Sequence, residues 1–419
     1  MMTPIPRSRQ SMPFDKLFRV ALRNLLRQVR HSVFALAGIS IGVMGLALAD
    51  GFIQDVFRQL GEATVKGQLG HIQVARQGFR EGGAGRPEAF VIEDGDAIRN
   101  AIARQADVRT VAGRVQLSGV LNAANRELPV EVVGSEPELE ADAGDYLTLL
   151  DGVALERAAE FSALLGEGVA RQLGVRAGDF VTLTAATFDG SLNALELEVA
   201  GIFRTFSKDY DDRAVRVRLA EAQELVQVAG VNTLVIGLAD TDRTATVLES
   251  IRRIPQLAGL DASPWYELSD FYANTRELYA RQFGVLQLIA LCLIAMSVLT
   301  STNITVFERT AEFGTMRALG ARSRTVVALI VLESVVLGLL GAVLGSVLSV
   351  VVGSGLSWIG IPMPPPPNAE AGFTARILLT PGAVLSASLV GVASAVLGAL
   401  LPSIRVARLP IVTQLGQRI

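Results

Sequence analysis

The stretch "FERTAEFGTMRALGARSR", residues 307–324, decides the fold of this chain, because it places four arginines and two glutamates between two apolar segments. Residues 282–306 before it carry no charge, and residues 325–358 after it carry only Glu333. A helix needs about 20 apolar residues to cross a bilayer, and both flanking segments are long enough. The stretch is therefore predicted to be a short polar connection between two membrane spans.

The composition agrees with a membrane protein. Of the 419 residues, 50% are hydrophobic and only 19% are charged, which is more apolar than usual for a soluble chain. One cysteine, Cys292, and two histidines, His31 and His71, are too few for an intrachain disulfide or a His/Cys zinc site. The cysteine content leaves the redox compartment open.

Four segments are predicted to be transmembrane helices: residues 32–52, 282–306, 325–358 and 377–403. Basic residues precede the first segment, so a cleaved signal peptide is the alternative interpretation of it. The length of the apolar run, and the lack of an Ala-x-Ala-like site before a clear mature start, favour a transmembrane helix.

Charge predicts the orientation of these spans, since positive residues stay in the cytoplasm. Residues 1–31 contain seven basic residues and one acid, and the tail, 404–419, contains three arginines and no acid. Residues 50–281 contain 23 basic and 36 acidic residues, a net charge of 23 − 36 = −13. We therefore expect cytoplasmic segments at 1–31, 307–324 and 404–419, and external segments at 53–280 and 359–376.

The external region is predicted to be an α+β domain. Strand-like runs such as "HIQVAR" (71–76) and "NTLVIGLAD" (232–240) alternate with helical runs such as "DRTATVLESIRRI" (242–254). "VQLSGVLNAANRELPVEVVG" (115–134) indicates two strands around a turn at 122–125, and a β-rich subdomain is expected near 136–205. Apolar residues at helical spacing after the first span and before the second predict helical stalks, with Ser269 or Asp270 as a cap.

Motifs for catalysis are missing from this sequence. It contains no G-x-x-x-x-G-K-[ST] loop for ATP phosphates, and His71, beside a predicted strand, is interpreted as structural. Glu333 lies inside a predicted span, where a charge is either functional or paired; we favour an ion pair with Arg309 or Arg317. Gly38, Gly42, Gly341 and Gly345 are predicted helix-packing positions, within the chain or against a second copy.

Four stretches resemble one known family. "ERTAEFGTMRALGARSRTVVALIVLESVVLGLLGAVLGSVL" (308–348) is similar to the signature of the FtsX-like permease domain. "LFRVALRNLLRQVRHSVFALAGISIGV" (17–43) and "LPSIRVARLPIVTQL" (401–415) resemble the beginning and end of that family, and "ALLGEGVARQLGVRAGDFVTL" (163–183) resembles its MacB-type periplasmic domain.

This resemblance implies a non-catalytic permease subunit of an ABC transporter in the bacterial inner membrane. It implies two copies of a separate ATPase that binds ATP and Mg²⁺, and a second permease, identical or homologous; neither a metal site nor a nucleic-acid partner is expected. Residues 307–324 would form the coupling helix that contacts the ATPase. The resemblance assigns charged contacts to Glu308, Arg309, Glu312 and Arg317, and apolar anchors entering the ATPase groove to Phe313 and Met316.

Three functions stay open. The first is release of lipoproteins or lipids from the inner membrane, as in the lipoprotein-releasing permeases, with a periplasmic lipoprotein carrier. The second is efflux of drugs, peptides or toxins with a periplasmic adaptor, as in MacB. The third is FtsX-like regulation of cell-wall hydrolases, for which the external domain is larger than needed.

Overall fold

The computed structural model describes residues 23–24, 29–81, 87–92, 95–124, 126–141, 147–187, 189–205, 207–363 and 372–416. It divides into two compact units. One is helical and comprises residues 1–56, 277–361 and 374–419; the other comprises residues 57–276 with 362–373.

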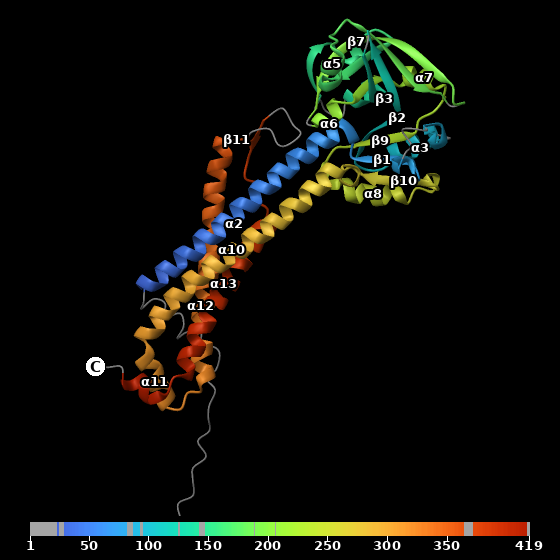
Figure 1. Ribbon diagram of the computed structural model, residues 1–419. Helices are drawn as coiled ribbons and strands as arrows, with labels where there is room; N and C mark the ends of the chain where they lie inside the picture. Colours follow the sequence, from blue (N-terminus) through green and yellow to red (C-terminus); the bar gives the residue numbers. More distant parts are fainter. Residues whose placement is uncertain are drawn as a thin grey trace, which may run out of the picture. The chain divides into compact units, whose positions relative to one another are not determined.

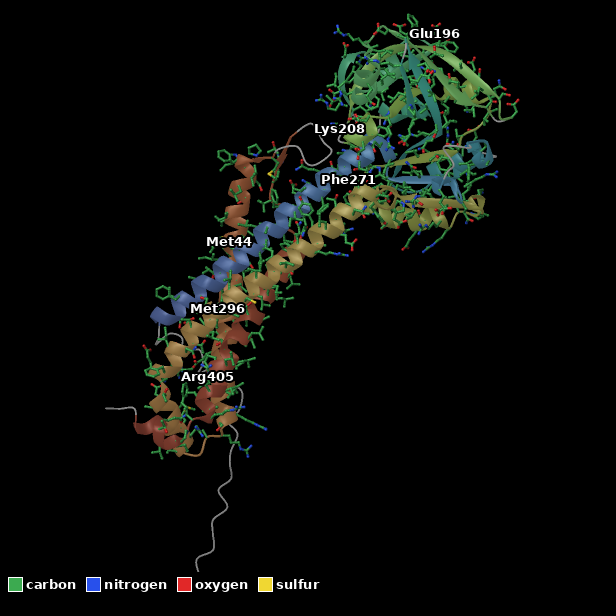
Figure 2. The ribbon with its side chains drawn as sticks, viewed as in Figure 1. Met44, Glu196, Lys208, Phe271, Met296 and Arg405 are labelled. Atoms are coloured by element: carbon green, nitrogen blue, oxygen red, sulfur yellow. The ribbon has the colours of Figure 1, made fainter. Side chains whose placement is uncertain are left out.

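Four long helices carry the apolar segments, and each is long and apolar enough to cross a membrane (Figure 1). They are α2 (Val29–Thr64), α10 (Asp270–Glu308), α12 (Ser323–Ile359) and α13 (Pro381–Arg408). In the helical unit Ile39, Val43, Ile294, Val298 and Ala395 form a buried core. Met296 on α10, in contrast, is 66% exposed (Figure 2).

The ends of these helices differ from the predicted spans. Helix α2 extends to Thr64 and α10 begins at Asp270, so both continue through the predicted stalks. The Ser269 hydroxyl accepts a hydrogen bond from the Tyr272 amide at 3.2 Å, which caps the second stalk. Helix α13 begins at Pro381 rather than residue 377, because Thr380 caps it and proline suits the first turn. The short strands β11 (Ile361–Met363) and β12 (Phe373–Ala375) pair between α12 and α13.

The other unit contains one continuous sheet with two hydrophobic cores. In the first lobe β1 (Ile72–Arg76) lies between β9 (Thr233–Leu238) and β10 (Leu260–Pro264), antiparallel to both. Helices α3 (Gly95–Ala103) and α8 (Thr244–Arg252) supply Ile98, Ile102, Val247 and Ile251 to a core shared with the strands. The predicted strands and helices at both ends of this domain are confirmed.

The second lobe is a closed six-stranded barrel. In ring order its strands are β2 (Val108–Ala123), β3 (Arg126–Ser135), β8 (Ala214–Arg218), β5 (Ser162–Gly166), β7 (Leu192–Arg204) and β6 (Phe180–Ala186), and β6 pairs again with β2. Leu121 aligns with Leu128 on one side and Leu183 on the other; Leu121 and Leu183 belong to the barrel core, and Leu128 packs against it. Helices α5 (Glu167–Leu173) and α7 (Leu219–Val226) contribute to the same core. In Figure 1 these elements are the green and teal part of the ribbon.

The residue range predicted for the β-rich subdomain, 136–205, was too narrow. The hairpin of β2 and β3, correctly predicted around its turn, belongs to the barrel and not to the first lobe alone. The first half of β2 pairs with β9, and its second half pairs with β6, so this 16-residue strand joins the two lobes. Strand β4 (Thr148–Gly152) pairs with β7 at the outer end of the sheet.

The remaining elements are short. They are η1 (Val65–Leu69), η2 (Phe79–Glu81), η4 (Pro87–Phe90), α4 (Pro137–Ala141), η5 (Leu155–Arg157), α6 (Lys208–Asp211), η6 (Thr241–Arg243), η7 (Pro255–Leu257), α9 (Trp265–Leu268), α11 (Thr310–Ala318) and α14 (Ile411–Gly416). Of these, η1 is a single π-helical turn that follows α2, and α11 lies in the charged stretch between α10 and α12.

Candidate functional site

The charged stretch folds into a short helix set off from both neighbours. Helix α10 ends at Glu308, Arg309 breaks the helical geometry, and α11 occupies residues Thr310–Ala318. The amides of Gly320 and Ala321 donate to Arg317 O and Met316 O, both at 3.0 Å, and close α11. Gly320 has φ +102°, a conformation that favours glycine. The glycine of the "ALGAR" sequence is therefore the residue that turns the chain toward α12.

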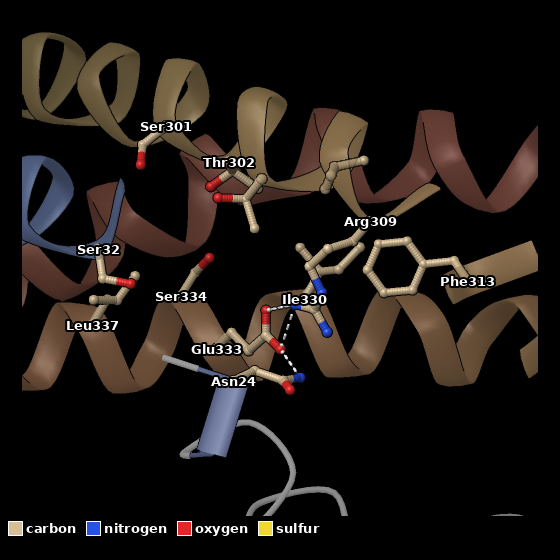
Figure 3. A pocket seen from close by; sticks show the side chains of 12 residues that line it. Asn24, Ser32, Ser301, Thr302, Arg309, Phe313, Ile330, Glu333, Ser334 and Leu337 are labelled. Atoms are coloured by element: carbon tan, nitrogen blue, oxygen red, sulfur yellow. Dashed lines mark hydrogen bonds and ion pairs between the residues drawn. The ribbon is translucent and has the colours of Figure 1, made fainter. Parts of the chain in front are cut away.

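A buried ion pair lies beneath α11. Arg309 Nη1 donates to Glu333 Oε1 and Oε2 at 3.0 and 3.1 Å, and both residues are 7% exposed (Figure 3). Asn24 donates to Glu333 Oε1 at 2.7 Å, and Arg309 Nε donates to Glu312 at 3.1 Å. The guanidinium also lies 5.0 Å from the centre of the Phe313 ring. Arg309 thus connects α11 to α12 and, through Glu333, to the amino-terminal segment.

Arg317 has a different partner. Its Nη1 donates to Leu409 O at 2.6 Å, at the end of α13. Of the two arginines considered for Glu333, the structure therefore pairs Arg309 with it, and Arg317 ties α11 to the last long helix.

The resemblance assigned Phe313 to an apolar anchor in a groove of the ATPase; in this structure the Phe313 side chain faces its own chain. Phe313 is fully buried in a cluster with Val306, Val326, Leu329, Ile330 and Val406, and Met316 packs against that cluster in a partly buried position. Thr310, Phe313 and Gly314, at i, i+3 and i+4, make up the buried face of α11. Phe313 therefore anchors α11 to its own chain in this structure.

The outward side of the stretch carries other residues. Glu308 is exposed, and the Glu312 side chain is 56% exposed. Leu319, in the turn after α11, is 85% exposed, and Phe307, at the end of α10, is 71% exposed. Leu319 was not singled out from the sequence, although an aliphatic residue before a turn glycine in a charged loop was a usable signal.

A small polar cavity adjoins the ion pair. Hydroxyl groups of Ser32, Ser301, Thr302, Thr305 and Ser334 line it together with Asn24, Arg309 and Glu333 (Figure 3). No group of three or more His, Cys, Asp and Glu side chains that could hold a metal occurs among the residues the structure describes. The arrangement suits a fixed charge pair in a hydroxyl-rich setting.

The predicted packing glycines contact other helices of the same chain. A Cβ at Gly38 or Gly42 would lie 2.7 Å from Ser297 Oγ or 2.4 Å from Ile294 Cδ1, both on α10. A Cβ at Gly341 or Gly345 would lie 2.6 Å from Ile39 Cγ2 or 2.7 Å from Ser40 O, both on α2. Helix α2 therefore approaches α10 and α12 so closely that side chains are excluded at these positions.

His71 is a buried structural residue. Its Nδ1 accepts a hydrogen bond from the Leu238 amide at 3.1 Å, and its Nε2 lies 3.1 Å from Thr241 Oγ1. Burial lowers its pKa to about 4, helped by the positive charge of Lys66, so the ring is neutral at pH 7. With both ring nitrogens engaged, His71 is not placed to act as a general base.

Comparison with known proteins identifies this architecture. A family model for the MacB-like periplasmic core domain matches residues 32–254, and one for the FtsX-like permease C-terminal domain matches residues 284–411. These two matches define the class as an ABC transporter permease. The chain belongs to the ABC transporter permeases that combine a MacB-like periplasmic core domain with an FtsX-like permease domain.

Two curated relatives and one solved structure are similar to this chain. The lipoprotein-releasing system transmembrane protein LolC of Neisseria meningitidis is 23% identical over 77% of this chain and 77% of its own length. The macrolide export ATP-binding/permease protein MacB of Bdellovibrio bacteriovorus is 23% identical over 86% of this chain, which spans 57% of that protein. The periplasmic region of MacB from Actinobacillus actinomycetemcomitans, a crystal structure, is 12% identical with a TM-score of 0.34, covering 51% of this chain and 95% of that one.

Proposed function

We propose that this chain is the permease subunit of an ABC transporter in which ATP hydrolysis by a separate ATPase moves the external domain. The main support for this proposal is the length of helices α2 and α10. Helix α2 has 36 residues and α10 has 39, so at 1.5 Å per residue α10 is about 58 Å long, against about 30 Å for a bilayer core. Each helix is therefore long enough to span the membrane and continue as a stalk outside it.

The proposed topology has four spans in the bacterial inner membrane. The amino terminus, α11 and the carboxyl terminus are cytoplasmic, and the domain between α2 and α10 is periplasmic. The charge distribution described above supports this orientation, since the region between the first two spans is strongly acidic.

The proposed assembly contains two permeases and two ATPases. Only 11% of the apolar window of α10 is buried, against 33% for each of the other three long helices, so α10 offers the most apolar surface to a second permease. ATP and Mg²⁺ bind the ATPase, because this sequence contains no P-loop motif. The name of the MacB relative, an ATP-binding/permease protein, supports an ATP-binding function within the same family.

We propose that α11 is the coupling helix. Its exposed contact surface consists of Glu312, with Glu308 before the helix and Leu319 after it. Arg309, Phe313, Met316 and Arg317 hold the helix to the permease. The helix is thus held to the permease on one side and exposes charged and apolar groups on the other. Such a helix can transmit a displacement of the ATPase to the permease.

For the cargo, we propose lipoproteins or lipids released from the inner membrane to a periplasmic carrier. The relative named as part of a lipoprotein-releasing system supports this, because its alignment covers the same 77% share of both chains. The alternative is export of small molecules or peptides through a periplasmic adaptor, which the MacB relative favours.

The test is co-purification of the full-length complex with its ATPase and any lipidated protein. Leu319→Asp should abolish ATPase recovery at an unchanged thermal midpoint, since the side chain is 85% exposed. Val412→Asp is the matched control, because Val412 is 84% exposed on α14, outside the coupling helix. Normal ATPase recovery with Leu319→Asp would contradict the coupling role, and a bound small molecule without lipidated protein would favour export.

A further inference from the structure

The carboxyl end of the first stalk is fixed to the external domain in an unusual way. After Thr64, α2 widens into the π-helical turn η1, and the Gly70 amide closes it by donating to Val65 O at 2.8 Å. Gly70 has φ +66°, and a Cβ there would lie 2.2 Å from Val235 Cγ1 of β9. The chain can thus leave the helix in this direction only with glycine, and the turn lies directly against the sheet.

Three consecutive carbonyl groups of η1 each accept a hydrogen bond from a side chain on a different strand. Gly67 O accepts from Arg216 Nη2 of β8 at 2.5 Å, and Gln68 O accepts from Arg114 Nη1 of β2 at 2.5 Å. Leu69 O accepts from Gln73 Nε2 of β1 at 2.8 Å. The donor residues are 6%, 6% and 8% exposed, in that order.

The chemistry of these contacts suits the end of a helix. The last carbonyls of a helix lack partners within it and carry the negative end of its dipole, so cationic donors are favoured there. A guanidinium stays charged when buried, and Arg216 also lies 5.6 Å from the centre of the Phe203 ring. Such bonds are directional, unlike the neighbouring apolar contacts of Leu60, Val65, Trp265 and Tyr272.

The three donors belong to both lobes. Gln73 lies in the first lobe and Arg216 lies in the wall of the barrel. Arg114 pairs in register with Thr233 of β9 and with Ser135 of β3, at the point where β2 passes from one lobe to the other. The end of α2 is therefore bonded to each lobe and to the strand that joins them.

We propose that Arg114 and Arg216, with Gln73, are positioning residues that impose the movement of α2 on both lobes of the external domain together. This inference rests on the proposed function, in which α2 moves during the ATPase cycle. In this proposal η1 is a rigid joint between α2 and the external domain. Loss of the two guanidinium groups makes that joint flexible.

The experiment measures distances by pulsed electron paramagnetic resonance on the full-length chain in nanodiscs, with Cys292→Ser as background. One spin label at residue 63 on α2 is combined with a second at 196 on β7 or at 249 on α8. The parent should give one narrow distance peak for each pair. Arg114→Met with Arg216→Met should lose that peak, and Arg114→Lys with Arg216→Lys should regain part of it, because lysine still donates.

The matched control is Arg252→Met, which removes an arginine that also donates to a backbone carbonyl, Ala262 O at 2.8 Å, away from η1. It should keep both narrow peaks, and near-ultraviolet circular dichroism should show a folded domain in every variant. Narrow peaks in the Arg114→Met, Arg216→Met double variant would overturn the proposal. So would equal broadening in the control or in the lysine variants.

The same samples separate this inference from the proposed function. If no ATPase co-purifies with the parent, the proposed function fails, while the peak widths still test the joint. If the ATPase co-purifies and ATP changes the 63–196 and 63–249 distances in the methionine variants but not in the parent, both are supported.

Discussion

Arg309 and Glu333 form a buried pair of opposite charges, and each charge is stabilised by the other. Removing one partner of a buried ion pair leaves an uncompensated charge, whereas removing both leaves none. We predict that Glu333→Leu lowers the stability of the helical unit by about 3–5 kcal/mol. Arg309→Met combined with Glu333→Leu should restore most of the lost stability. Thermal unfolding in detergent, analysed as a double-mutant cycle, measures the difference.

A double variant as unstable as Glu333→Leu alone would contradict this account. It would mean that the hydrogen bonds of Arg309 to Glu312 and of Asn24 to Glu333 matter more than charge balance. Because Arg309 also contacts Phe313, the coupling assay should be repeated on the double variant.

His71 makes the external domain sensitive to acid. Its pKa in the folded domain is about 4 and its ordinary value is 6.5, so the unfolded chain takes up the proton first as the pH falls. Its stabilising effect is complete above pH 6.5 and is lost between pH 6.5 and 4. We predict a loss of about 2 kcal/mol by pH 5, which His71→Asn should abolish because asparagine does not titrate. Thermal midpoints between pH 7 and 5 measure it.

Asp211 changes the stability of the domain in the opposite direction over nearly the same pH range, and it serves as the control. Burial raises its pKa to about 6, so the folded domain favours the protonated acid. Its favourable contribution is present below pH 3.8 and is lost as the pH rises through 6. Asp211→Asn should therefore steepen the loss of stability on acidification. A shallower loss would refute the assignment.

At the scale of elements, the approach of α12 to α2 depends on the lack of a side chain at Gly345. A methyl group there would lie 2.7 Å from the backbone oxygen of Ser40, which cannot rotate away. We predict that Gly345→Ala destabilises the helical unit by about 1–3 kcal/mol. Gly355→Ala, on the same helix with open space around it, should be neutral or slightly stabilising. Thermal unfolding of the two purified variants compares them, and equal midpoints would show that the helices separate freely.

The elements that sequence reasoning predicted well are those with a strong local signal. Apolar runs predicted the long helices, and the "NAAN" turn predicted the β2–β3 hairpin, because each signal lies within one segment. The closure of the barrel was not predicted, since the pairing of β6 with β2 joins Leu183 to Leu121 across distant segments. The burial of Phe313 within its own chain was not predicted for a related reason: the composition of α11 does not tell which of its faces the other helices cover.

At the scale of the whole molecule, the proposed topology can be tested with two single cysteines. Leu150 on β4 is 41% exposed and Thr315 on α11 is also exposed, so a thiol at either position is accessible. In a Cys292→Ser background, a membrane-impermeant reagent added outside spheroplasts should label position 150 and not position 315. Permeabilised cells, in which both should react, are the control. Labelling of 315 alone would reverse the orientation.

The pairing of β1 has a consequence for biosynthesis. Its partners are β9 and β10, with Ile72 opposite Ile236 and Pro264. In this domain β1 therefore cannot pair until β9 and β10, which come much later in the sequence, have been translated. Pairing of such distant segments is slow and exposes unpaired strands meanwhile. Strand β10 ends at Pro264 and α10 begins at Asp270, so the domain closes as the second apolar helix leaves the ribosome. In the proposed topology, completion of this domain and insertion of α10 are thereby brought close together in time.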